Sequence, residues 1–306
     1  MAYRGNTEKR WSKSPGRYFL LRLLFIIGMS TLPGSTFAQT PISAKAHDAG
    51  ESDIVSGANT PQSLAFKFAS CEDELTGYLV KPEGSGPFPV VIWNHGSGKQ
   101  LDDEGNAYTF GKVPSFYVSH GFVVVFPFRH ESGVSPDYSG THATQVKAMT
   151  PVEMLDVRLE DVIAAVEYVK KLPYIDTSRM AMSGLSVGGI ETVLASEKGL
   201  GMKCFVPFAP GAMSWANPEL RTREIAAIKA AKAPVFLLQA RNDFSLGPSE
   251  VLGAILKQKG SPNQSKVYPD YGVSHEDGHR NFALAGCDIW GADVLQFLDA
   301  NLKIHR

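Results

Sequence analysis

Several short stretches of the chain are almost entirely apolar, and helical patterns separate them along the sequence. Unbroken apolar runs of this length are typical of strands that are buried on both faces of a parallel sheet. They lie at residues 89–94, 121–127, 179–183, 204–208 and 235–239. Apolar residues recur at helical spacing between and after them, in the segments 151–173, 189–197, 225–231, 249–259 and 288–302. The alternation predicts an α/β domain whose sheet is mostly parallel and carries helices on both faces.

One catalytic domain is expected to span residues 63–306. Patterned runs at 64–68 and 76–80 predict an antiparallel pair of strands before the parallel ones, and a last strand is expected at 266–268. Residues 39–62 are rich in Ala, Ser, Gly and Pro and show no apolar period. They therefore predict a flexible linker outside the fold.

Residues 1–38 have the order of features that is typical of a secretory signal peptide. One acidic residue, Glu8, stands among six basic ones, which are Arg4, Lys9, Arg10, Lys13, Arg17 and Arg22. An apolar run at 23–29 and the small-residue site Thr36-Phe37-Ala38 follow. A membrane anchor is the alternative, but this run falls short of the roughly 20 apolar residues that cross a bilayer. We predict a periplasmic or secreted protein that begins near Gln39 and keeps no stable membrane anchor.

Composition narrows the class of protein. Of 306 residues, 43% are hydrophobic and 20% are charged, which excludes an intrinsically disordered chain. Lys and Arg number 30 and Asp and Glu 31, and this balance argues against nucleic acid as a partner. Three cysteines are too few for a disulfide scaffold, and their spacing matches no zinc pattern. Either two of them form a disulfide and the third is a buried thiol, or all three are buried and free.

Gly184-Leu185-Ser186-Val187-Gly188 lies between a predicted strand and a predicted helix. In that setting Gly-x-Ser-x-Gly indicates a nucleophile elbow, a sharp turn that projects the serine oxygen from the edge of a sheet. The two glycines let the turn pack closely. Ser186 then lies at a helix N-terminus, where free backbone N–H groups favour developing negative charge. The alternative is a chance match of a short motif, and the strand–turn–helix setting favours the nucleophile.

A serine nucleophile needs a base, and the base needs an acid that orients it. Asp243 follows the apolar run at 235–239, so it is expected at the edge of the sheet where parallel strands place their functional residues. The alternative for this residue is an Asx turn or a helix cap. Asp270, after the last predicted strand, ranks second for the acid, because it lies too near the histidines in sequence for the usual arrangement.

Two histidines, His275 and His279, compete for the role of base in the loop after the last predicted strand. We favour His279, because Gly278 lets the backbone turn just before it and Phe282 can pack beside its ring. His275 is then either a substrate contact or a solvated residue of the loop.

These blocks resemble those of α/β-hydrolases, and the similarity covers about residues 70–300. Gly184–Gly189, Gln239–Asp243 and Asp277–His279 look like the Ser, Asp and His blocks of that superfamily. Pro87–Val91 leading to Asn94–Ser97, and Trp290–Val294, resemble the dienelactone hydrolase-like group in particular. The resemblance implies an α/β-hydrolase fold without a large lid domain, and a reaction that needs no metal or cofactor. Dienelactone hydrolases proper use a Cys nucleophile, whereas Ser186 points to a general serine esterase.

His95-Gly96-Ser97-Gly98 follows a predicted strand at the place where this family has part of its oxyanion hole. The resemblance implies that backbone N–H groups of Val187 and Ser97 hold the oxyanion, with Gly96 as the alternative second donor. Each such donor contributes about 3 kcal/mol to catalysis. His95 is expected to be structural, because it precedes Ser186 in the chain, against the family order.

Residues 129–150 are long for a connection between a strand and a helix. Long loops are often functional, so we expect this one to line the substrate pocket, with His130 and Tyr138 as contacts. The alternative is a surface loop without a role. Its histidines and acidic residues show no metal-ligand spacing.

The sequence therefore favours a secreted carboxylic-ester hydrolase that acts on a small-molecule substrate. Ser186 attacks the ester carbonyl, His279 moves the proton, and Asp243 orients His279. The alternatives are a peptidase or a thioesterase of the same fold, and a non-catalytic binding protein on this scaffold. Peptidases of related fold usually carry an extra domain for which no segment of this sequence is apparent. A binding protein is expected to have lost one of the three catalytic residues, and all three are present.

Overall fold

The computed structural model describes residues 62–71, 73–97, 110–130 and 151–305. By its internal contacts the chain divides into two units, residues 1–42 and 43–306, and every described residue belongs to the second. The predicted signal peptide lies outside the described residues, as does the predicted linker apart from Gln62. Tyr138 also lies outside them.

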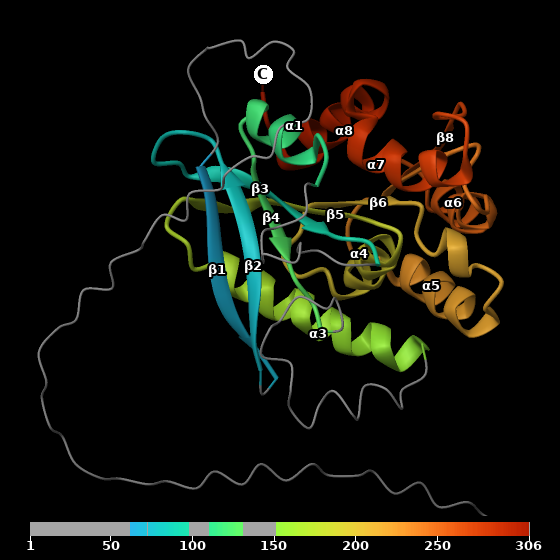
Figure 1. Cartoon of the computed structure of the whole chain (residues 1–306), viewed down its shortest axis with the longest axis horizontal. Coiled ribbons are helices and arrows are strands. Elements are labelled where there is room, and N and C mark those ends of the chain that lie inside the picture. The colour runs from blue at the N-terminus through green and yellow to red at the C-terminus, as the bar shows by residue number, and fades with distance from the viewer. Residues whose placement is uncertain (1–61, 72, 98–109, 131–150, 306) are drawn as a thin grey trace, which may run out of the picture. The chain divides into compact units, whose positions relative to one another are not determined.

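Eight strands form a single sheet in the order β1-β2-β4-β3-β5-β6-β7-β8 (Figure 1). Their bounds are β1 (Gln62–Ser70), β2 (Asp73–Lys81), β3 (Phe88–Asn94), β4 (Val123–Pro127), β5 (Ile175–Leu185), β6 (Cys204–Phe208), β7 (Phe236–Ala240) and β8 (Gln264–Tyr268). The strands β1, β2 and β4 pair antiparallel, and all pairs from β4 to β8 are parallel. The predicted antiparallel pair and mostly parallel sheet are therefore confirmed.

Alternate residues of the parallel strands face two separate hydrophobic clusters. In β3, Val90 and Ile92 belong to one cluster, and Val91 and Trp93 belong to the other. This is the pattern expected of strands whose successive side chains point to opposite faces of a covered sheet. It explains why the sequence of these strands is apolar without a break.

Helices cover both faces of the sheet, as predicted. The first cluster is completed by α3 (Pro151–Val169), α4 (Val187–Lys198), α5 (Pro218–Ala230) and α6 (Gly247–Lys259). The second is completed by α1 (Val113–Ser119), α7 (Phe282–Ala285) and α8 (Cys287–Leu302). Two short segments, η1 (Ala212–Ser214) and the π-helical turn η2 (Asp277–Asn281), lie in loops.

Three helices differ from the sequence prediction, and one of them is the four-residue α7, which is too short to show a helical repeat. The helix α5 begins at Pro218, seven residues before the predicted start at Ile225, because Asn217 caps it by accepting hydrogen bonds from the backbone of Glu219 and Leu220. The extra turns are mostly charged and carry no apolar period. The helix α1 was not predicted, since seven residues are too few to show a helical repeat.

All three cysteines are free thiols, so the disulfide alternative is wrong. Cys204 and Cys287 are buried, whereas Cys71 is exposed, which also differs from the alternative of three buried thiols. No helix in the described part of the chain is long and apolar enough to cross a membrane. Among the same residues, no group of three or more potential ligands is arranged to hold a metal ion.

The carboxyl ends of the parallel strands meet at one edge of the sheet, and the predicted site residues follow them. His95 and Gly96 come after β3, Ser186 comes after β5, and Asp243 comes after β7. The loop after β8 carries His279. Parallel α/β sheets place their functional residues at this edge. The backbone topology alone therefore brings these four segments to the same edge of the sheet.

Candidate active site

Ser186 occupies a strained turn between the end of β5 and the start of α4. Its backbone has φ 58° and ψ −116°, a conformation that costs a residue with a side chain about 1–3 kcal/mol. Two backbone hydrogen bonds hold it, from Ser186 N to Phe208 O at 3.0 Å and from Ile190 N to Ser186 O at 2.9 Å. This is the geometry of a nucleophile elbow, which the motif predicted.

The glycines on either side of Ser186 are required by close backbone packing. A Cβ atom built on Gly188 would overlap the backbone of Asn94 and His95. A Cβ atom on Gly184 would overlap the carbonyl of Gly188 and stand 2.7 Å from the Asn94 oxygen. The elbow can therefore press against the end of β3 only because both positions lack a side chain.

Asp243 and His279 form a buried pair. His279 Nδ1 donates a hydrogen bond of 2.8 Å to Asp243 Oδ1, and the exposed fractions of the two side chains are 4% and 0%. Asp243 Oδ1 also accepts from the backbone N–H of Phe244 at 2.6 Å, and Oδ2 accepts from Gln239 Nε2 at 3.0 Å. The carboxylate is thus fixed from three directions and in turn fixes the imidazole ring.

The second ring nitrogen of His279 is left for a proton from elsewhere. His279 Nε2 is buried and makes no hydrogen bond to any described residue. With Nδ1–H committed to Asp243, Nε2 is the acceptor of the neutral ring. It is the atom that would take the Ser186 proton, and in free enzymes such contacts often close only when substrate binds.

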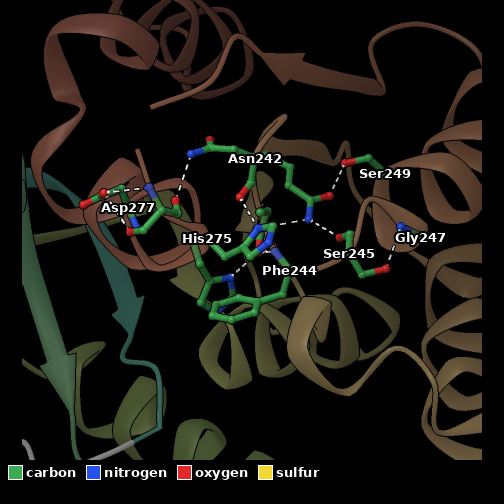
Figure 2. A network of polar contacts seen from close by, with 11 residues as sticks. Asn242, Phe244, Ser245, Gly247, Ser249, His275 and Asp277 are labelled. Atoms are coloured by element: carbon green, nitrogen blue, oxygen red, sulfur yellow. Dashed lines mark hydrogen bonds and ion pairs between the residues drawn. The ribbon is translucent and has the colours of Figure 1, made fainter. Parts of the chain in front are cut away.

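The two candidate histidines differ sharply in environment. His275 is exposed and its Nδ1 donates to the backbone oxygen of Asn242 at 2.9 Å, so no carboxylate orients it (Figure 2). The geometry of a base with an orienting acid is found at His279 alone of the two. Asp270, the second candidate for the acid, pairs with Arg241 at 2.9 Å on the surface.

The ring that supports His279 is Phe244, which the sequence analysis did not single out. Its centroid lies 5.4 Å from that of His279, edge to face, and 5.6 Å from that of His275. Phe282 was expected in this place, but it packs in the core against Phe208 and against Tyr268. Phe244 directly follows Asp243, and this adjacency was the available signal.

Gly278 serves the site through close packing. A Cβ atom on it would overlap the side-chain oxygen of Asn242. That side chain donates to the carbonyls of Tyr271 and Ser274 at 2.9 and 2.8 Å. Asn242 therefore ties the loop after β7 to the loop after β8. This link helps to hold His279 beside Asp243.

The structure places Gly96 beside the nucleophile. A Cβ atom on Gly96 would stand 3.6 Å from the Ser186 Cβ atom and 3.6 Å from the backbone oxygen of Leu185. Ser97, the predicted donor, is exposed. Val187 is the first residue of α4, so its N–H belongs to the helix start, where no intrahelical acceptor exists. The geometry therefore supports Gly96 at least as well as Ser97, and the donor pair of Val187 and Ser97 stays a prediction.

A buried charged cluster lies behind this loop. Arg129 Nη2 donates to the backbone oxygen of His95 at 2.7 Å, and His95 Nδ1 donates to Gly96 O at 2.7 Å. Burial and the positive charge of Arg129 hold the pKa of His95 well below its usual value. His95 is thus a neutral ring within the loop, in line with the structural role expected of it.

Glu191 in α4 belongs to the same cluster and was missed in the sequence. It is fully buried, and neither carboxylate oxygen has a hydrogen-bond partner among the described residues. Burial raises its pKa to about 8, against the opposing effect of Arg129 and Arg158. An acidic residue within the mostly apolar segment 187–195 was the available signal.

His130, predicted to contact the substrate, lies in a cluster that joins the first hairpin to α3. Its Nδ1 and Nε2 bond Asp161 and Asp73 at 2.7 and 2.9 Å. Ser70 Oγ donates to the same Asp161 at 2.7 Å. Burial lowers the pKa of His130, but hydrogen bonds to the two carboxylates outweigh this and raise it. Both ring nitrogens are engaged, so this placement gives no support to substrate binding, and Tyr138 lies outside the described residues.

Many solved structures have this fold, and three of them are 16–19% identical in sequence to the chain. An acylaminoacyl peptidase from Pyrococcus horikoshii is 19% identical with a TM-score of 0.61, and a puromycin-hydrolyzing peptidase from Mycobacterium tuberculosis is 18% identical with a TM-score of 0.57. The match covers 81% of this chain in both cases, but only 43% and 41% of the peptidases.

A proposed dienelactone hydrolase from Klebsiella pneumoniae is matched over its whole length. It is 16% identical with a TM-score of 0.55, and the match covers 80% of this chain and 100% of that one. The search of curated proteins gave no match. These likenesses show an α/β-hydrolase fold and agree with the topology described above.

The model of the dienelactone hydrolase family matches residues 75–300, which include β3, the elbow, Asp243 and His279. This is well over half of the chain, and it begins and ends close to where the resemblance in the sequence does. The chain therefore belongs to the dienelactone hydrolase family and has the α/β-hydrolase fold.

Proposed function

We propose that the protein hydrolyses carboxylic esters of small molecules through an acyl-enzyme on Ser186. The observation that carries this proposal is the buried pair of Asp243 and His279, whose Nε2 is left as an acceptor at the edge of the sheet from which Ser186 emerges. A hydroxyl nucleophile, a base and an orienting acid are the parts that acyl transfer requires.

The steps follow from these atoms. His279 Nε2 takes the proton as Ser186 Oγ attacks the ester carbonyl, and the imidazolium that forms is stabilised by Asp243. Backbone N–H groups of Val187 and of the loop at Gly96 or Ser97 stabilise the oxyanion. The proton passes to the departing alcohol, and water activated by the same nitrogen then releases the acid. The steps use protein groups and one water molecule, so the proposed mechanism invokes no metal or cofactor.

A peptidase is the second candidate, because structures of peptidases share the fold. Amides are less reactive than esters and need a well-placed acid for the leaving amine, so the same triad can serve either substrate. A thioesterase, or a binding protein without activity, would be the remaining outcomes.

A matched panel of substrates tests the proposal. Purified protein would be assayed on nitrophenyl esters of rising chain length, on thioesters of the same acyl groups and on peptide nitroanilides, with Ser186→Ala as the control. We expect ester turnover that depends on Ser186, together with covalent labelling of Ser186 by a fluorophosphonate. Turnover of nitroanilides alone would replace the proposal by the peptidase, and a failure to label Ser186 would leave the binding protein.

We further propose that the chain is exported and cleaved after Ala38. Support comes from the order of basic, apolar and small residues in the first 38 positions. Intact-mass measurement on protein from the envelope fraction of the native cells tests this. A mass that lacks residues 1–38 is expected, and a full-length mass in the cytosolic fraction would overturn it.

A further inference from the structure

Gln239 lies behind the orienting acid and has no part in the mechanism above. It is the fourth residue of β7 and is fully buried. A buried amide needs all its polar atoms paired, since each unpaired one costs about 1–3 kcal/mol.

The amide group of Gln239 forms hydrogen bonds with Asp243, with Ser245 just before α6, and with Ser249 in α6 (Figure 2). Gln239 Nε2 donates to Asp243 Oδ2 at 3.0 Å and to the backbone oxygen of Ser245 at 2.6 Å. Gln239 Oε1 accepts from Ser249 Oγ at 2.7 Å. The two groups that face Nε2 are both acceptors, so the amide has one usable orientation, and Ser249 at the start of α6 fixes it.

The arrangement controls rotation of the Asp243 carboxylate. Oδ1 already accepts from His279 and from the backbone of Phe244, at 2.8 and 2.6 Å. Rotation about the terminal bond of an aspartate is soft, and Gln239 is the donor that holds Oδ2. Without it the carboxylate can turn and offer a different oxygen, or a worse angle, to His279.

We propose that Gln239 is a positioning residue that acts on the base through Asp243, and that Ser249 sets the orientation of its amide. The inference rests on the proposed function, because it assigns Gln239 to the alignment of that triad. It predicts that Gln239 affects the rate at which Ser186 reacts more than it affects substrate binding.

Gln239→Met is the first test, since Met has a similar length and no hydrogen-bonding amide. We expect kcat to fall about 10- to 100-fold, the range that small misplacements of catalytic groups produce. KM should stay within about twofold. A normal kcat in folded Gln239→Met protein would overturn the proposal.

Ser249→Ala is the milder variant, for the case in which Gln239→Met does not fold. It removes the hydroxyl that fixes Gln239 Oε1, and we expect a fall in kcat of about 2- to 10-fold from one lost hydrogen bond. Ser196→Ala is the matched control, because Ser196 is equally a buried serine but bonds Val193 O within α4. Equal rates for Ser249→Ala and Ser196→Ala would count against the proposal.

A double-mutant cycle separates positioning from a general effect on the fold. In an Asp243→Asn background, Gln239→Met should lower the remaining rate by less than about twofold, because the group it acts through is already gone. An equal loss in both backgrounds would assign Gln239 to the fold rather than to Asp243.

Gln239→Glu adds a readout in pH. The protonated carboxyl of the new glutamate donates a hydrogen bond to Asp243 as the amide does, whereas the ionised carboxylate repels Asp243. The rate relative to the parent should therefore be highest at low pH and fall as pH rises. A ratio that does not change with pH would contradict the contact.

The deciding experiment is independent of the substrate. The proton shared by His279 Nδ1 and Asp243 is recorded by proton NMR at low field in the parent, in Gln239→Met and in Ser196→Ala. We expect its resonance to shift or vanish in Gln239→Met alone, and an unchanged resonance would overturn the inference. If the parent shows this signal but no reaction with a fluorophosphonate or with esters, the proposed function fails while the positioning role of Gln239 is still decided.

Discussion

The two sides of Ser186 each contain a buried acidic residue, and the two residues differ in the hydrogen bonds that they accept. On the base side, formed by the loops after β7 and β8, Asp243 is buried and accepts hydrogen bonds from His279, Phe244 and Gln239. On the oxyanion side, formed by the ends of β3 and β4 and by α4, Glu191 is buried and accepts none from the described residues. Burial raises the pKa of Glu191 to about 8, so it is neutral at moderate pH.

The difference indicates that a negative charge is useful beside His279 and unfavourable on the other side of Ser186. In the proposed mechanism the imidazolium of His279 forms during the reaction and needs a fixed negative partner, and Asp243 has the hydrogen-bond donors that hold it in place. The oxyanion of the proposed mechanism is negative, and an ionised Glu191 on the same side of Ser186 would repel it. A protonated Glu191 avoids that repulsion, and a neutral His95 likewise adds no charge of its own.

The largest effect is expected where both sides meet. Ser186→Ala should abolish ester hydrolysis, at least about a thousandfold, because no other group can form the acyl-enzyme. The far-ultraviolet circular dichroism spectrum should be unchanged, since alanine fits the same turn. Turnover equal to that of the parent, with an unchanged spectrum, would show that the nucleophile is elsewhere.

On the base side, His279→Ala should lower kcat/KM and the rate of fluorophosphonate labelling by about a thousandfold or more. His275→Ala is the matched control, because His275 lies in the same loop but bonds the backbone of Asn242 and contacts the Phe244 ring instead of pairing with Asp243. It should keep most of the labelling and change mainly KM. The reverse pattern would assign the triad to Ser186, Asp243 and His275.

On the oxyanion side, Glu191→Gln tests whether the carboxyl is held neutral. The ordinary pKa of 4.5 in the unfolded chain lies below the folded value of about 8, so the folded chain keeps a proton that the unfolded chain releases. Stability of the parent should therefore fall between these pH values relative to the variant, by up to about 1.4 kcal/mol per pH unit. Urea unfolding at several pH values measures this.

Glu224→Gln in α5 is the comparison for that experiment. Glu224 is also buried, and burial alone raises its pKa to about 8, whereas Glu191 faces Arg129 and Arg158. The two variants should show the same dependence on pH. A slope for Glu224→Gln and none for Glu191→Gln would show that Arg129 and Arg158 keep Glu191 ionised, and the contrast between the two sides would disappear.

The smallest effect is expected at Phe244, which has 41% of its surface exposed and contacts His279. Phe244→Leu removes an edge-to-face contact of about 0.5–1.5 kcal/mol, equivalent to about 2- to 10-fold in rate. Steady-state kinetics on esters of rising size would show it as a moderate loss that depends on the substrate. Ile289→Ala, an exposed apolar residue of α8, is the control and should change nothing.

Local patterns in the sequence predicted the features that depend on neighbours in the chain. The elbow at Ser186, the buried strands and the order of helices all follow from residues within one element, and the structure contains them. Asp243 was expected because it follows a strand whose end lies at the functional edge. The contacts of Gln239 could not be predicted, because they depend on how closely α6 approaches that edge. Adjacency to Asp243 was a signal for Phe244, but its contact with the His279 ring also depends on where the turn at Asp277–Asn281 lies.

The contacts on the oxyanion side were harder to predict from the sequence, for the same reason. Arg129 and Glu191 are far apart in sequence and come together only when β4 and α4 pack on β3. His130 was expected at the substrate because its loop is long, yet its ring belongs to a cluster with Asp73 and Asp161. Loop length gives no information on which way a residue near the start of the loop, such as His130, points.

The shape of the elbow does not depend on which nucleophilic atom the side chain of residue 186 carries. Its geometry depends on Gly184 and Gly188, which let the end of β3 approach, and on backbone hydrogen bonds of residue 186 rather than on its side chain. The identity of the atom at the tip of that side chain is therefore free to change while the turn persists. A lineage built on this fold can exchange an oxygen nucleophile for a sulfur one by a single substitution, and so move between chemistries without rebuilding the scaffold.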